Sequence, residues 1–174
     1  IIVISPLLSL IADQTEKINR QSRIHGKIAY NLSNVEDEDA FFSLQEVNEN
    51  GNILLCTPEK MASSYFRGRM KQIYKKRGIS YIVVDEAHLV SVHGNTFRPD
   101  YLRLNVVRQD FPDVPIYCFS ATVNNFSVCA LKNILDLKFV QIFKLDPDRS
   151  NLHLNVHYET KNYHRCTCSV VGCT

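Results

Sequence analysis

The sequence predicts an α/β fold in which a parallel β-sheet is sandwiched between helices. Short β-branched apolar segments alternate with longer segments of helical period, and this alternation is typical of strand–helix–strand units. The short segments are apolar throughout, as strands buried on both faces require. A length of 174 residues and a hydrophobic content of 45% suit one domain with a substantial core.

The expected strands are the short apolar segments, which in chain order are Ile1–Ser5, Lys27–Tyr30, Asn52–Thr57, Tyr81–Asp85, Ile116–Ser120 and Phe139–Phe143. The expected helices lie between them, at Leu7–Arg23, Asp37–Asn48, Pro58–Lys76, Pro99–Gln109 and Asn124–Leu135. The first helix illustrates the pattern, because Leu10, Ile11 and Ile18 share one side and charged residues are available for the other.

The end of the chain differs from the rest in pattern. We expect residues 1–145 to form the α/β domain, and residues 146–160 to form a linker and a first strand toward a further domain. The linker begins with DPDRSN, and Leu152–Tyr158 alternates as a strand does. No structure is predicted from Asn162 onward, so residues 161–174 are an unassigned tail.

Charge is unevenly distributed, although a net charge of +2 is too small to indicate a partner. Residues 67–77 hold six basic residues and no acid, while residues 36–39 form the acidic block EDED. The basic segment is interpreted first as the solvated face of a helix, with a phosphate-binding surface as the alternative.

The six cysteines do not form the framework of a secreted protein. Cys56, Cys118 and Cys129 lie in or near apolar segments, so we expect small buried side chains in a reducing compartment. The spacing of the polar and thiol groups in the tail matches no common zinc pattern, so no metal is expected at His164, Cys166, Cys168 and Cys173.

The opening segment, IIVISPLLSLIA, resembles the core of a signal peptide but lacks a basic leader, and Asp13 and Gln14 follow where small residues are expected. No stretch reaches the roughly 18 apolar residues that a membrane helix needs. These features predict a soluble protein without a membrane partner. Because the chain starts inside an apolar strand, we expect that a preceding part is missing.

Polar residues follow four of the expected strands. In an open parallel sheet, ligands bind beyond the carboxyl ends of the strands. Each motif alone fits ordinary turn or helix-cap chemistry, but together they predict one site. The motifs are Ser5-Pro6, Thr57-Pro58-Glu59, Asp85-Glu86-Ala87-His88 and Ser120-Ala121-Thr122.

Two adjacent carboxylates at a strand end repel each other, and a divalent cation removes that penalty. We expect Asp85 to hold Mg²⁺ through water, with the metal bridging phosphate oxygens. Glu86 is then placed to orient and deprotonate an attacking water. His88 is expected near the hydroxyls of Ser120 and Thr122, where it could transmit the nucleotide state to a second site.

These motifs together resemble the first RecA-like motor domain of a superfamily 2 helicase, and specifically of the RecQ family. Asp85–His88 is similar to helicase motif II, but DEAH alone is weak evidence. DEAH followed by FRPDY, with SPLxSL upstream, is strong, and the resemblance covers roughly residues 1–160. The other matches are Val3–Gln14 (VISPLLSLIADQ) to motif Ia, Leu54–Lys60 (LLCTPEK) to motif Ib, Phe119–Thr122 (FSAT) to motif III, Ser91–Tyr101 (SVHGNTFRPDY) to the aromatic-rich loop, and Asp148–Asn151 (DRSN) to the link into the second motor domain.

The resemblance implies ATP and Mg²⁺ as cofactors and DNA, as single strands and duplex junctions, as the partner. Asp85 and Glu86 would serve hydrolysis, with His88, Ser120 and Thr122 near the nucleotide. The residues implied along the single-strand track are Ser5, Pro6, Ser9, Thr57 and Glu59. The residues implied in the DNA-sensing loop are His93, Phe97, Arg98 and Tyr101. Stacking on aromatic rings, worth about 1–3 kcal/mol per base, suits a motor that moves over any sequence. Phe97 and Tyr101 could instead pack against the sheet edge.

The chain departs from the family pattern in two places. His93 stands where the loop usually carries Trp, and Asn95-Thr96 replace His-Asp, which removes an acidic partner for Arg98. The phosphate-binding sequence GxxxxGK[ST] is also absent, since Gly26-Lys27 is followed by Ile28 and has no glycine five residues earlier. By resemblance that loop would precede Ile1, and a second motor domain would follow, so the domain is expected to be truncated at both ends.

The leading hypothesis is therefore that the chain is part of an ATP-dependent DNA helicase of RecQ type. The resemblance implies 3′-to-5′ polarity, and we expect this piece alone to be inactive. Such a protein would act in DNA repair and recombination, in the nucleus of a eukaryote or otherwise in the cytoplasm. One alternative is a truncated, non-catalytic domain that only binds nucleic acid. Another is an RNA helicase of the DEAD/DEAH groups, which shares the carboxylates but does not account for FRPDY.

Overall fold

The computed structural model describes residues 1–23, 26–43, 51–90, 99–122, 124–145, 152–157 and 167–172. The chain forms two compact units, Ile1–Val140 and Gln141–Thr174. The predicted end of the α/β domain at residue 145, and that of the linker and first strand at residue 160, stay predictions. None of the helices within these described ranges is long and apolar enough to cross a membrane.

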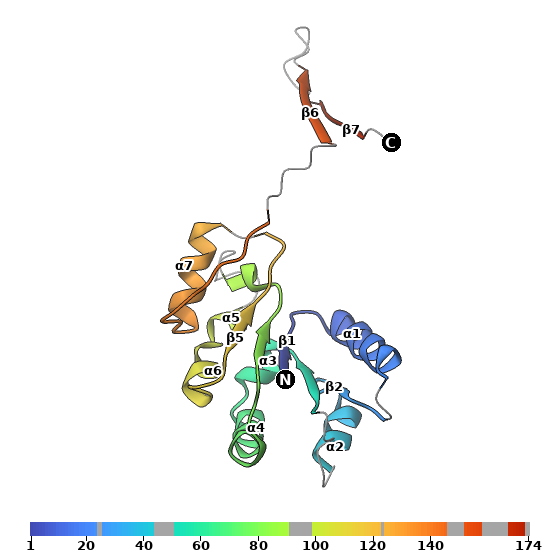
Figure 1. Ribbon diagram of the computed structural model, residues 1–174, viewed down its shortest axis with the longest axis vertical. Helices are drawn as coiled ribbons and strands as arrows, with labels where there is room; N and C mark the ends of the chain where they lie inside the picture. The colour runs from blue at the N-terminus through green and yellow to red at the C-terminus, as the bar shows by residue number, and fades with distance from the viewer. Residues whose placement is uncertain are drawn as a thin grey trace. The chain divides into compact units, whose positions relative to one another are not determined.

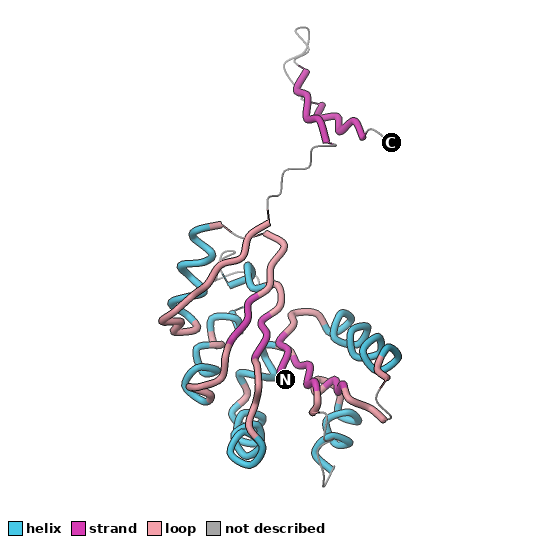
Figure 2. Tube along the Cα trace, viewed as in Figure 1, coloured by secondary structure: helices cyan, strands magenta, loops and turns pink. Residues whose placement is uncertain are grey.

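The first unit is built on a parallel five-stranded sheet, as the sequence predicts (Figures 1 and 2). The strand order is β2-β3-β1-β4-β5, and every neighbouring pair is parallel. The strands are β1 (Ile2–Ile4), β2 (Ala29–Asn31), β3 (Ile53–Cys56), β4 (Ile82–Val84) and β5 (Ile116–Cys118). Each lies within a predicted strand or overlaps it.

Helices connect the strands and cover the sheet unequally. On one face, Ile11 of α1 packs with Ala29 and Leu55. On the other face, a larger core includes Phe41 of α2, Phe66 and Met70 of α4, Val107 of α6 and Leu131 of α7. The helices are α1 (Leu8–Gln21), α2 (Val35–Ser43), α3 (Pro58–Ala62), α4 (Ser64–Arg77), η1 (Ala87–Val90), α5 (Pro99–Leu102), α6 (Asn105–Asp110) and α7 (Asn125–Ile134).

The predicted helix Pro58–Lys76 is in fact two helices, α3 and α4, separated by Ser63. Ser63 has an extended backbone with φ −66° and ψ 127°. Met61 and Phe66 are both fully buried although their spacing places them on different sides of one straight helix. The break allows both side chains to enter the same core, and sequence periodicity does not reveal it.

The predicted helix Pro99–Gln109 is also divided, into α5 and α6. Its buried residues Tyr101, Leu104 and Val107 recur at every third position. The amide of Leu104 donates to the carbonyl of Tyr101, and the amide of Val107 donates to the carbonyl of Leu104. These tight turns bring residues three apart onto one face, which a regular α-helix does not do as well.

The predicted strand Phe139–Phe143 is wrong, because residues 139–143 have no strand structure. Phe139 is 98% exposed and Phe143 is 86% exposed. The apolar pattern of a strand does not say whether a neighbouring edge is available for pairing, and these residues have no ladder partner among those the structure describes.

The cysteine predictions are confirmed for one residue and wrong for two. Cys56 is fully buried in β3, and burial raises the pKa of its thiol to about 12, so the thiol stays protonated. Cys118 and Cys129 are exposed. Cys118 lies on β5, an outer strand of the sheet, and Cys129 lies on α7, so an apolar neighbourhood in sequence does not ensure burial for either.

The basic segment of α4 is used partly for helix packing. Arg67 and Lys71 lie 3.4 and 2.6 Å from the carboxylate of Asp110 on α6. The guanidinium of Arg69 lies 3.4 Å from the centre of the Phe42 ring. For these three residues, neither a purely solvated face nor a free phosphate-binding surface describes the environment.

The second unit contains a two-stranded antiparallel sheet of β6 (Leu152–His157) and β7 (Thr167–Gly172). Residues 152–157 confirm the predicted strand, while Tyr158 lies outside the described residues. No structure is predicted for the tail, and its residues 167–172 pair with β6, which the tail's composition does not signal. His164, Cys166 and Cys173 of the tail also lie outside the described residues, as does the linker 146–151.

Candidate active site

The predicted edge of polar motifs exists, and the strand register shows why. Ile4 lies beside Cys56 on one side and beside Val84 on the other, and Val84 lies beside Cys118. Because all these strands are parallel, the residues that follow them emerge at the same edge of the sheet. The motifs after β1, β3, β4 and β5 are therefore neighbours in space.

Asp85 is held at this edge by contacts to its backbone and its side chain. Its amide donates to the carbonyl of Ile4 at 2.9 Å, which continues the parallel ladder. Its carboxylate accepts from the amide of Glu86 at 2.9 Å and from the hydroxyl of Ser5 at 3.4 Å. Its carbonyl accepts from the hydroxyl of Tyr101 at 3.1 Å. Asp85 thus joins elements that are far apart in sequence.

Glu86 has a left-handed backbone with φ +48°, which is unusual for a residue other than glycine. Such a conformation costs about 1–3 kcal/mol and persists where neighbouring contacts enforce it. Here the amide of Ala87 donates to the carbonyl of Phe119, and the amide of Leu89 donates to the carbonyl of Glu86. The side chain of Glu86 is 39% exposed, so its carboxylate can meet a ligand.

His88 lies between Glu86 and the motif after β5, as predicted for Ser120. Its Nδ1 is 3.0 Å from the hydroxyl oxygen of Ser120 and 3.2 Å from a carboxylate oxygen of Glu86. The Ser120 hydroxyl donates to the carbonyl of Thr122 at 2.9 Å. His88 thus joins the Glu86 turn to the motif after β5, with the direction of each hydrogen bond set by the tautomer of the ring.

The donor set at this edge fits Mg²⁺ bound together with a nucleotide. Carboxylate oxygens are hard ligands, and Mg²⁺ usually takes one or two of them and completes its shell with phosphates and water. In the described part of the chain there is no group of three or more His, Cys, Asp or Glu that could hold a metal. Asp85 and Glu86 could hold Mg²⁺ if phosphate and water oxygens completed its shell.

The residues predicted along the nucleic-acid track differ in exposure. Ser5, Pro6, Thr57 and Tyr101 are buried, while Ser9 and Glu59 are exposed. The hydroxyl of Thr57 accepts from the amide of Lys60 and caps α3. Contact of these residues with nucleic acid stays a prediction, and the hydroxyl of Thr57 serves a local hydrogen bond. His93, Phe97 and Arg98 lie outside the described residues.

The sequence interpretation missed Ser33, which follows β2 at the same edge. Its hydroxyl accepts from the amide of Thr57 at 3.2 Å and so ties the β2–α2 turn to the start of α3. The rule that ligand-facing residues follow parallel strands applies to β2 as well, and it could have indicated this turn.

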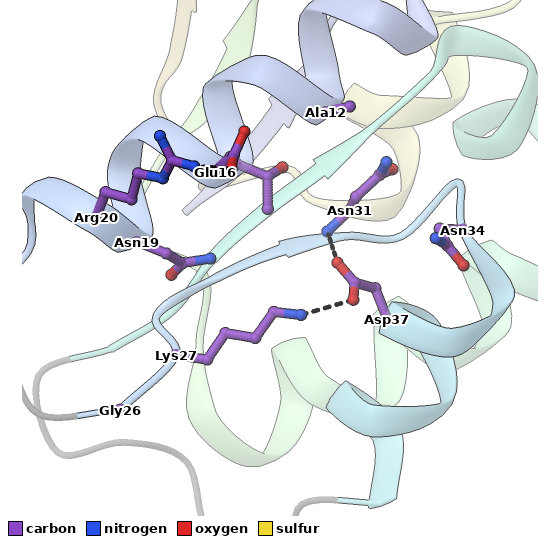
Figure 3. Close-up of a pocket in the computed structure, with 10 residues that line it drawn as sticks. Ala12, Glu16, Asn19, Arg20, Gly26, Lys27, Asn31, Asn34 and Asp37 are labelled. Atoms are coloured by element: carbon purple, nitrogen blue, oxygen red, sulfur yellow. Dashed lines mark hydrogen bonds and ion pairs between the residues drawn. The ribbon is translucent and has the colours of Figure 1, made fainter.

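A polar groove of about 620 Å³ lies elsewhere, along α1, β2 and the start of α2 (Figure 3). In it Lys27 pairs with Asp37 at 2.6 Å, and Asp37 also accepts from the amide of Asn31 at 2.9 Å. Lys27 therefore takes part in a local ion pair, and the Gly26-Lys27 sequence is not a phosphate-binding loop. The residues that line the groove are Ala12, Thr15, Glu16, Asn19, Arg20, Gly26, Lys27, Asn31, Asn34 and Asp37.

The parallel sheet, its covering helices and the Asp85–Glu86 turn at its carboxyl edge define a RecA-like α/β domain. The family model described as DEAD/DEAH box helicase matches residues 1–129. The chain therefore belongs to the DEAD/DEAH box helicase family.

Among curated proteins, the chain is similar to RecQ-type helicases, as the motifs predict. The chain is 36% identical over 156 residues to the RecQ-like DNA helicase BLM of Xenopus laevis, covering 89% of this chain and 11% of that protein. It is 33% identical over 162 residues to the ATP-dependent helicase SGS1 of Saccharomyces cerevisiae, covering 92% and 11%. It is 32% identical over 164 residues to the ATP-dependent DNA helicase Q1 of Pongo abelii, covering 92% and 25%. The chain thus spans only a small part of the length of these relatives.

Proposed function

We propose that the chain is part of the first motor domain of an ATP-dependent DNA helicase of RecQ type. The observation that carries the proposal is the Asp85–Glu86 turn, held in a strained backbone at the carboxyl edge of a parallel sheet. The names of the relatives support the same function, because one is a RecQ-like DNA helicase, one an ATP-dependent helicase and one an ATP-dependent DNA helicase.

In this proposal each residue of the turn has a separate task. Asp85 would hold Mg²⁺ through water, and the ion would supply positive charge at the phosphates of ATP. Glu86 orients the attacking water and accepts its proton, which suits an accessible carboxylate. His88 contacts both Glu86 and Ser120, so it is placed to report the state of the nucleotide to the motif after β5.

Hydrolysis would drive translocation on single-stranded DNA with 3′-to-5′ polarity and the unwinding of duplex junctions. A phosphate-binding loop and a second RecA-like domain of the same protein would complete the motor. Because the relatives named above come from eukaryotes, we propose a nuclear protein that acts in DNA repair and recombination.

The test is DNA-stimulated ATP hydrolysis by the full-length protein that contains this chain, with Asp85→Asn or Glu86→Gln. Loss of a positioned general base lowers a rate by about 10²–10⁴-fold, so we expect at least a 100-fold loss for Glu86→Gln. Asp37→Asn, in the β2 groove, is the matched control and should keep its rate. Stimulated hydrolysis retained in both turn variants would contradict the proposal.

The alternatives predict different outcomes of the same assay. An RNA helicase would be stimulated more by RNA than by DNA. A non-catalytic nucleic-acid-binding domain would bind single strands in a salt-dependent manner, because phosphate contacts release counterions, and would show no hydrolysis even in the full-length protein.

A further inference from the structure

Tyr101 is a buried residue near the site that the proposed hydrolysis does not use. It lies on α5 and is fully buried, so its ring is unable to stack on a base of a nucleic acid. Its hydroxyl donates to the carbonyl of Asp85 at 3.1 Å. A buried tyrosine hydroxyl needs such a partner, because burial without a hydrogen bond is unfavourable.

The carbonyl that Tyr101 contacts belongs to the peptide group between Asp85 and Glu86. The amide of the same peptide group donates to the carboxylate of Asp85 at 2.9 Å. Both ends of this one peptide are therefore held, the oxygen by Tyr101 and the N–H by the side chain of Asp85. Rotation of the peptide would change the direction of the Asp85 carboxylate and the left-handed φ of Glu86 together.

A second contact reaches Asp85 from the opposite direction in sequence. Ser5 follows β1, is fully buried, and donates from its hydroxyl to the Asp85 carboxylate at 3.4 Å. This hydrogen bond is long, so the restraint from Tyr101 is the stronger one. Ser5 and Tyr101 together restrain the carboxylate and the backbone of the same residue.

We propose that Tyr101 is a positioning residue for hydrolysis, whose hydroxyl sets the orientation of the Asp85–Glu86 peptide and thereby of both carboxylates. The inference rests on the proposed function and deepens it. It also reassigns Tyr101 from a nucleic-acid contact to a support of the Mg²⁺ and water site. A ring that served packing alone would work equally well as phenylalanine, and this difference makes the proposal testable.

The experiment uses Tyr101→Phe in the full-length protein, with Tyr30→Phe as the matched control. Tyr30 is also buried, and its hydroxyl also donates to a backbone carbonyl, that of Lys27, at 3.1 Å. Tyr30 lies on the outer strand β2, which β3 and β1 separate from β4. Equilibrium binding of a fluorescent ATP analogue is measured with and without Mg²⁺, together with the kcat and KM of DNA-stimulated hydrolysis.

We expect Tyr101→Phe to bind the analogue normally without Mg²⁺. The gain in affinity that Mg²⁺ produces should be about fivefold smaller in the variant than in the unchanged protein, which is the effect of one lost hydrogen bond. We expect kcat to fall by about tenfold with little change in KM, since the geometry of the water-activating group is disturbed. Tyr30→Phe should change neither quantity. Urea unfolding of both variants checks that each is folded.

Ser5→Ala provides a second route that leaves the tyrosine in place. It should lower the Mg²⁺-dependent affinity by a smaller factor, and its combination with Tyr101→Phe should depart from multiplicative behaviour because both act on Asp85. Unchanged Mg²⁺-dependent binding and kcat in folded Tyr101→Phe would overturn the inference, as would equal losses in Tyr30→Phe. If Glu86→Gln abolishes hydrolysis while Tyr101→Phe is normal, only this inference fails and the proposed function stands.

Discussion

Two polar clusters at different places on the same sheet differ in how their groups are satisfied. The β4 cluster consists of Asp85, Glu86 and His88, and the β2 cluster consists of Asn19, Lys27 and Asp37. In the β2 cluster, opposite charges pair and Asn19 hydrogen-bonds the backbone of β2 through both ends of its amide. In the β4 cluster, two acids are adjacent and one has a strained backbone.

The difference separates polar groups that stabilise the fold from polar groups that are arranged for chemistry. Asn19 accepts from the amides of Ile28 and Ala29 and donates to the carbonyl of Ala29, so it closes the outer strand of the sheet much as a neighbouring strand does. The Asp85–Glu86 turn places two carboxylates side by side, and Glu86 has a left-handed backbone and a side chain that is 39% exposed. A cluster whose groups are already paired is therefore a poor candidate for a site, even when it lines a groove.

The largest expected difference between the clusters concerns Glu86→Gly. Glycine accepts the left-handed conformation, so stability should rise by up to about 1 kcal/mol, while loss of the carboxylate should lower ATP hydrolysis by at least about 100-fold. Asp136→Gly is the matched control, because Asp136 has φ +46° and is exposed beyond α7. It should give a similar gain in stability with unchanged hydrolysis. Urea unfolding and the ATPase assay measure the two effects, and hydrolysis retained in Glu86→Gly would remove the contrast.

A smaller effect of the opposite kind is expected for Asn19→Ala. Three hydrogen bonds to the edge of β2 are lost, and with partial replacement by water the free energy of unfolding should fall by about 2 kcal/mol. Hydrolysis by the folded protein should be unchanged. Asn124→Ala, which removes the cap of α7, should cost only about 1 kcal/mol and serves for comparison. A loss for Asn19→Ala below that of Asn124→Ala would show that the outer strand needs no such closure.

The smallest effect is expected for Lys27→Met, which removes the ion pair with Asp37 at the mouth of the groove. Both side chains are partly exposed, so the pair should contribute about 0.2–1 kcal/mol, less at high salt. Denaturant unfolding at low and high ionic strength measures the difference. A loss well above this range, or one that does not depend on salt, would indicate that the groove is more strongly organised than its exposure suggests.

Much of the fold and part of the site could be predicted from sequence. Five of the six strands predicted within residues 1–145 exist, because short apolar segments between helical segments are a strong signal. The meeting of His88 and Ser120 followed from the parallel edge alone. The breaks at Ser63 and before α6 could not be predicted, because they depend on which side chains the core must receive.

The sequence by itself determined the parallel α/β architecture, the positions of the polar motifs after the strands, and the similarity to RecQ-type helicases. These properties depend on local composition and spacing, which the chain carries directly. Only the tertiary structure decided that Ser5 and Tyr101 turn inward to Asp85, that Cys118 is exposed, and that β7 pairs with β6. Each of these depends on a partner distant in sequence, and residue type alone does not reveal whether such a partner is within hydrogen-bonding or packing distance.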